Sequence, residues 1–127
     1  MAIRYSVDRF HRRLIAHADG VLTFDDIDAH LDEEQRNRDL DVPELFDARG
    51  ASTTLTTEQV ERLVGRAVDM LRVTDLGPTA IVTTNDVLYG MARMYAVLAE
   101  GAGAPADVFS DMSAALRWLD GFRDDER

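Results

Sequence analysis

Cysteine and lysine are both missing from this 127-residue sequence, and each absence excludes a class of site. Without cysteine the chain can form no disulfide scaffold, no thiolate metal site and no thiol nucleophile. Without lysine all 14 cationic side chains are arginines, which are scattered along the chain and outnumbered by 24 acidic residues. Because nucleic-acid binding depends on clustered cations, the formal net charge of −10 leads us to expect no nucleic-acid partner.

Long apolar runs are missing as well. The stretch MARMYAVLA, residues 91–99, is nearly apolar but carries Arg93, and it is shorter than the roughly 20 residues that cross a bilayer. The opening residues MAIRYSVDRF are charged and lead into no apolar segment, so we expect no signal peptide. These features predict a cytoplasmic protein without membrane insertion.

Strands and helices alternate in the pattern of apolar residues. A chain of this length forms one domain, which we place at 1–121, with a polar tail at 122–127. The expected elements are strands at 3–7 and 13–18, a helix after Thr23, a strand at 43–47, a helix after Thr56, a strand at 79–83, a helix after Asn85, a strand at 107–109 and a helix after Ser110. Gly20 is expected to end the second strand. This β-β-α-β-α-β-α-β-α order predicts an α/β fold with a hairpin and a mostly parallel sheet.

Four stretches resemble a known family: ADGVLTFDDI, ELFDARGAS, NDVLYGMARMYAVLAE and DVFSDMSAALRWL. With the element order, they resemble the SpoIIAA-like or STAS-like domains, and within these the small uncharacterised bacterial branch. The resemblance covers nearly the whole chain. It implies a single-domain SpoIIAA-like fold and a noncatalytic regulatory or protein-interaction module that binds a partner protein or a second copy of itself.

A phosphoacceptor is the first candidate site that the resemblance suggests. In anti-sigma-factor antagonists of this fold, a strand leads into an Asp-Ser-Ser-Gly turn whose serine is phosphorylated by a partner kinase. The equivalent region here is ELFDARGASTTLTTEQV, with Ser52, Thr56 and Thr57 as candidate acceptors. None of its hydroxyl residues follows an Asp or precedes Ser-Gly. The alternative is structural, because Thr56 is a good helix N-cap and Gln59 completes a capping box.

The carboxyl ends of the parallel strands are a second candidate site, because helix N-termini converge there on polar ligands. Residues that follow three of the expected strands could bind a small anion or polar head group, with an arginine as the charge partner: Asp47, Arg49, Thr83, Asn85 and Ser110. The alternative is that each residue is a helix cap or turn residue. An enzyme using Asp47 and Arg49 is the least favoured hypothesis.

A lipid-like or other small ligand beneath the third helix is a further alternative. Tyr89, Met91, Met94 and Tyr95 would line it, and Gly90 would allow a close approach to the helix backbone. Ordinary packing of the helix on the sheet explains the same pattern.

The remaining polar residues predict no further site. His11, His17 and His30 lie in separate elements, and a single His30 and Glu34 pair at i,i+4 spacing is a poor metal site. The acidic residues of the first helix are typical of a solvated face: Asp26, Asp28, Asp32 and Glu34. Since no nucleophile with its base or phosphate-binding loop is recognisable, we expect no catalysis, no metal and no cofactor.

Overall fold

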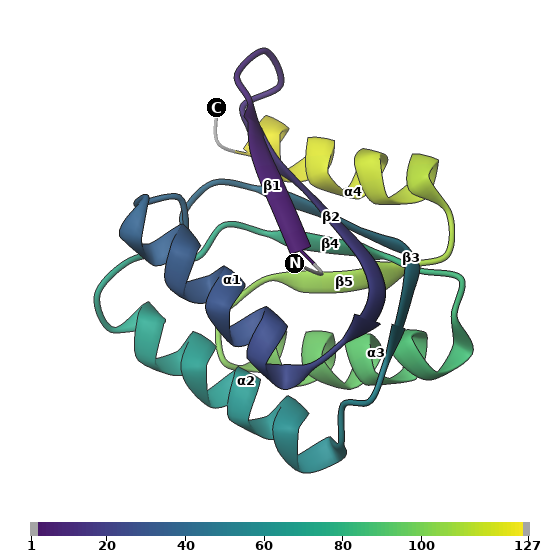
Figure 1. Cartoon of the computed structure of the whole chain (residues 1–127). Helices are drawn as coiled ribbons and strands as arrows, with labels where there is room; N and C mark the ends of the chain where they lie inside the picture. The colour runs from purple at the N-terminus through teal and green to yellow at the C-terminus, as the bar shows by residue number, and fades with distance from the viewer. Residues whose placement is uncertain (1–2, 126–127) are drawn as a thin grey trace.

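The computed structural model describes residues 3–125 and contains a five-stranded sheet and four helices (Figure 1). In chain order the elements are β1 (Ile3–Asp8), β2 (Arg13–Leu22), α1 (Phe24–Arg36), β3 (Glu44–Thr53), α2 (Thr57–Leu71), β4 (Thr79–Val82), α3 (Asp86–Gly101), β5 (Ala106–Phe109) and α4 (Met112–Asp125). The order of elements predicted from the sequence is confirmed. No described helix is long and apolar enough to cross a membrane.

The sheet follows the order of the chain, β1-β2-β3-β4-β5. The β1–β2 hairpin is antiparallel and every other neighbouring pair is parallel. Each parallel connection moves one strand in the same direction, and right-handed crossovers then place α1, α2 and α3 on a single face. Figure 1 shows α4 on the opposite face, where it contacts β3, β4 and β5.

The side chains of β3 divide between these two faces. Leu45 packs with Val82 and Leu119 beneath α4, whereas Phe46 belongs to the core on the α1–α3 side. Because side chains alternate along a strand, Glu44 shares the face of Phe46 and Asp47 shares the face of Leu45. The sheet therefore separates the environments of Glu44 and Asp47.

The strands β2 and β3 run further than the sequence predicts. Gly20 has a φ of 74° but lies within β2, opposite Ala51 of β3, and pairing continues to Leu22 and Thr53 after a register shift near Asp19. The expected strand end at Asp47 is thus wrong, because hydrogen bonding between the two strands overrides the local turn signals.

The last helix also differs from expectation at both ends. The Asp111 carboxylate accepts a hydrogen bond from the Ala114 amide at 3.1 Å, so Asp111 rather than Ser110 caps α4. The helix runs to Asp125, which makes residues 122–125 of the expected tail helical. Phe122 packs edge-on against Trp118, with ring centroids 4.7 Å apart. The end of that tail, 126–127, lies outside the described residues.

Two glycines give a test of this packing. A Cβ on Gly77 would lie 2.6 Å from the backbone of Val42, whereas a Cβ on Gly90 would meet no atom within 4 Å. We expect Gly77→Ala to lower the free energy of unfolding by about 1–3 kcal/mol, because backbone cannot yield as a side chain does. Gly90→Ala should raise it by about 0.5–1 kcal/mol, as an exposed helix position gains from alanine. Urea denaturation measures both, and an unchanged Gly77→Ala protein would contradict this packing.

Candidate functional site

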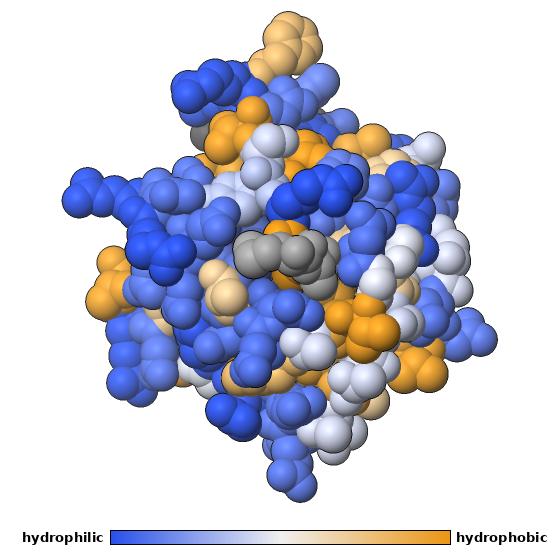
Figure 2. All heavy atoms as spheres, in the orientation of Figure 1, coloured by the Kyte–Doolittle hydropathy of each residue, from blue (hydrophilic) through white to orange (hydrophobic). Residues whose placement is uncertain are grey.

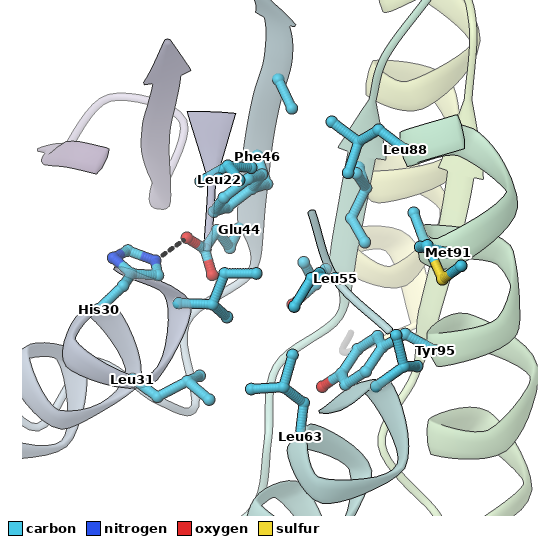
Figure 3. A pocket seen from close by; sticks show the side chains of 16 residues that line it. Leu22, His30, Leu31, Glu44, Phe46, Leu55, Leu63, Leu88, Met91 and Tyr95 are labelled. Carbon is cyan, nitrogen blue, oxygen red and sulfur yellow. Dashed lines mark hydrogen bonds and ion pairs between the residues drawn. The ribbon is translucent and has the colours of Figure 1, made fainter. Parts of the chain in front are cut away.

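A cavity lies between the sheet and the helices α1, α2 and α3 (Figure 3). The space within it that the centres of water molecules can occupy is about 110 Å³. One water needs roughly 10–15 Å³ on this measure, so the space admits several waters or a small organic molecule. Its wall is mostly apolar and includes Leu22, Phe46, Leu55, Leu63, Leu88 and Met91. Figure 3 shows these side chains converging from β2, β3, the loop before α2, α2 and α3.

Polar side chains from four elements line this wall: His30 of α1, Glu44 of β3, Thr79 of β4 and Tyr95 of α3. The His30 Nε2 atom lies 2.8 Å from Glu44 Oε2, the contact drawn dashed in Figure 3. Burial, and then the nearby carboxylates of Glu44 and Glu34, raise the pKa of Tyr95 to about 12. The Tyr95 phenol therefore stays protonated at neutral pH and can donate a hydrogen bond. Polar side chains therefore interrupt an otherwise apolar wall.

Glu34 completes a buried cluster with His30 and Glu44, which we call the His–Glu–Glu cluster. The side chains of His30, Glu34 and Glu44 are 5%, 4% and 9% exposed. Glu34 Oε1 lies 3.2 Å from the same His30 Nε2 that contacts Glu44. Burial raises the pKa of Glu34 well above its ordinary range, and the charge of Glu44 and a hydrogen bond with it raise it further. Glu34 thus holds a proton at neutral pH.

Helical periodicity explains why two members of this cluster, His30 and Glu34, point into the protein. Ile27, His30, Leu31 and Glu34 fall on one side of α1, so His30 and Glu34 turn inward with the two apolar residues. The interpretation of Glu34 as solvated is therefore wrong. Asp28 and Asp32 of the same predicted face bind Arg66 of α2 instead. Two features of the sequence point to this cluster. His30 and Glu34 are spaced i,i+4 on an apolar stripe of α1, and Glu44 is a charged residue at the start of the apolar run of β3.

The structure brings together only some of the residues that were predicted to form a site at the carboxyl ends of the parallel strands. Asp47 pairs with Val82, which pairs with Phe109, so Asp47 is level with the ends of β4 and β5. Both of its carboxylate oxygens accept hydrogen bonds of 2.9 Å from the Arg49 guanidinium. This side-chain hydrogen bond lowers the pKa of Asp47. Arg49 therefore neutralises Asp47 on the side of the sheet away from the cavity.

The other residues of that edge have structural contacts of their own. Thr83 is fully buried, and its hydroxyl oxygen accepts from the amide of Asn85. The side-chain oxygen of Asn85 accepts from the Leu88 amide at 2.9 Å and caps α3, as predicted. Ser110 is exposed beside the cap of α4. Ligand binding by these residues stays a prediction.

The candidate phosphoacceptors lie in three different settings. Ser52 is half-buried in β3, opposite Val21. Thr56 caps α2 through the Gln59 amide at 3.2 Å, and the predicted capping box is confirmed. Thr57 is exposed at the first position of the helix. Phosphorylation at any of them stays a prediction.

Only some of the residues that were expected to line a ligand site beneath α3 line the cavity. Met91 and Tyr95 line the cavity, but Tyr89 is not among its lining residues. Gly90 is exposed and its Cα faces open space, so the close approach expected there is wrong.

Glu34 gives a pH-dependent prediction. Its folded pKa is raised by burial, Glu44, Asp39 and Glu33, so the folded protein binds a proton that the unfolded chain releases. This contribution is fully present below the unfolded pKa and is lost as pH rises towards the folded pKa, by up to about 1.4 kcal/mol per pH unit. Glu34→Gln cannot ionise. We expect the unfolding free energy of Glu34→Gln, taken relative to that of the wild type, to be higher at pH 8 than at pH 5. Urea denaturation with a chelator present measures it.

Glu61→Gln is the matched control, since it removes an exposed carboxylate of α2 that lies outside the cluster and does not contribute to the raised pKa of Glu34. It should follow the pH dependence of the wild type. Parallel pH profiles for the wild type and Glu34→Gln would show that Glu34 is ionised in the folded protein.

Known proteins resemble this chain in fold. No protein-family model and no curated protein matches it. A crystal structure of an uncharacterised DUF3478-family protein with a SpoIIAA-like fold, from Shewanella loihica PV-4, is similar over 93% of this chain and 94% of that chain. The TM-score is 0.58 and the sequence identity 18%, a likeness that shows the fold alone. The chain is therefore a single α/β domain with the SpoIIAA-like fold that its sequence resemblance implied.

Proposed function

We propose that the protein is a noncatalytic binding module that holds a small, largely apolar molecule in the cavity beneath α3. The cavity itself is the observation that carries this proposal. Ligand sites in proteins are typically concave and apolar, with a few polar groups that orient the ligand. The chamber of about 110 Å³, with His30, Glu44, Thr79 and Tyr95 among its lining residues, has this character.

The polar lining residues specify the chemistry of the ligand's polar group. The Glu44 carboxylate accepts hydrogen bonds and the Tyr95 hydroxyl can donate one. A hydroxyl or amine on an otherwise apolar body matches this pair, because it donates to Glu44 while the body contacts Phe46 and Leu88. A small alcohol with an aromatic ring is the simplest molecule of this kind.

Benzyl alcohol tests the proposal directly. We expect it to shift the NMR signals of backbone amides around the cavity, notably near Leu88 and Met91, in a saturable manner. Ala92 lines the cavity, so Ala92→Leu fills part of the space and should weaken binding by at least about tenfold.

Ala29→Leu is the matched control, because it adds the same atoms at an exposed position of α1. It should bind benzyl alcohol as the wild type does. Signal shifts that are confined to the surface, or equal affinity in Ala92→Leu, would contradict a cavity site.

Binding of a partner protein, the first hypothesis from the sequence, is a second candidate. The observation that favours it is Phe10, which is 85% exposed in the turn of the β1–β2 hairpin. Figure 1 shows this turn projecting beyond the sheet, and Figure 2 shows a mainly hydrophilic surface on the same side of the molecule. An exposed aromatic ring of this kind can anchor a partner. A regulatory role for such an interaction is part of this second proposal.

A further inference from the structure

We propose that the His–Glu–Glu cluster is a binding site for a zinc-type divalent cation, with His30 Nε2 and one carboxylate oxygen each from Glu34 and Glu44 as ligands. Each residue offers one ligand atom, and these atoms all lie within 4.8 Å of one another. The proposal concerns the protein itself and does not depend on occupancy of the cavity by an organic ligand. It departs from the expectation of no metal that the sequence suggested.

The distances within the cluster suit a tetrahedral ion. His30 Nε2 lies 2.8 Å from Glu44 Oε2 and 3.2 Å from Glu34 Oε1. Ligand atoms that are about 2.0–2.2 Å from a tetrahedral zinc ion lie roughly 3.3–3.6 Å from one another. Small outward shifts of the three side chains, each well under the length of a bond, would therefore open the space that the ion needs.

The cluster sets two buried acidic side chains against a single imidazole nitrogen. Both carboxylates approach the same Nε2 atom, which carries at most one hydrogen. Among the described residues, His30 is the basic side chain within ion-pair distance of Glu34 or Glu44, and no arginine is. A divalent ion would displace the proton of Glu34, contact all three side chains at once and offset the charge of both carboxylates.

Two cavities leave room for further ligands of the ion. His30 and Glu44 line the larger cavity, and Glu34 and Glu44 line a second cavity of about 40 Å³ that shares Glu44 with it. A water molecule can occupy either side and complete the coordination, as in zinc sites with three protein ligands. A polar head group in the larger cavity could take the same position.

The surroundings hold the histidine in place. Tyr5 and Phe46 contact the His30 ring edge-on, with ring centroids 5.4 Å and 5.7 Å away. His30 and Glu34 are one helical turn apart on α1, and Glu44 lies at the start of a central strand. Ligands on rigid elements lose little conformational entropy on binding, which favours a defined site.

The ligand set indicates which metal should bind. Imidazole with carboxylates suits zinc and related transition metals, whereas magnesium and calcium favour six or more oxygen ligands. The cluster should therefore select zinc over magnesium.

Isothermal titration calorimetry of ZnCl₂ into the chelator-treated, dialysed full-length chain is the test. We expect one zinc ion per chain, no comparable binding of MgCl₂, and affinities at least about tenfold weaker in Glu34→Gln and Glu44→Gln. Glu61→Gln, which changes an exposed carboxylate outside the cluster, should bind as the wild type does. Zinc X-ray absorption on the wild type should show the outer-shell scattering of an imidazole ring, and His30→Gln should lose it.

Folding of the variants is checked by urea denaturation. Glu34→Gln is the decisive variant, because its amide resembles the protonated carboxyl that the folded protein already accommodates. No zinc binding by the wild type would overturn the proposal. Equal affinity in a folded Glu34→Gln protein would also overturn it, because the zinc would then lie on other acidic residues.

Discussion

Two glutamates buried against one imidazole constrain the α1–α3 face of the protein. Glu44 opens a central strand, while His30 and Glu34 belong to a helix that reaches it from outside the sheet. Displacing α1 would leave a buried carboxyl without its partner, and an unpaired buried charge costs several kcal/mol. The cluster therefore holds α1 over the start of β3. In this position α1 forms one wall of the cavity, so the shape of the cavity depends on the cluster.

The fold could be predicted from the sequence where the signals are local. The caps at Thr23, Thr56 and Asn85 each lie within four residues of the amide that they bind, and all three are confirmed. The ends of β2 and β3 could not be predicted in this way. Their last residues pair across more than thirty positions, as in Thr53 Oγ1 donating to the Leu22 carbonyl, so the turn signal of Gly20 was misleading.

The candidate site was less predictable because its members come from separate elements. The His30 and Glu34 spacing is visible in the sequence, yet a pair on one helix turn does not reveal its depth. Glu44 joins it only when β3 lies beside α1, which is a property of the sheet order. Asp47 shows the opposite case: it was predicted as a site residue, and its neighbour Arg49 already binds both carboxylate oxygens. Glu44 and Asp47 are both acidic, so residue type alone did not distinguish them. They differ because side chains alternate along β3, which places the two on opposite faces of the sheet.

The central claim is that Glu34 is protonated in the folded protein at neutral pH. The carbon atom of its carboxyl group reports this protonation directly. Carbon-13 NMR of the Glu34 carboxyl, assigned by comparison with Glu34→Gln and followed from pH 4 to pH 9 in chelator, measures its protonation. Because burial and Glu44 raise its pKa, the signal should keep the chemical shift of a protonated carboxyl at neutral pH. A signal that titrates near the ordinary value of about 4.3 would contradict the account. It would show that Glu34 is solvated and that α1 does not close over β3 as described.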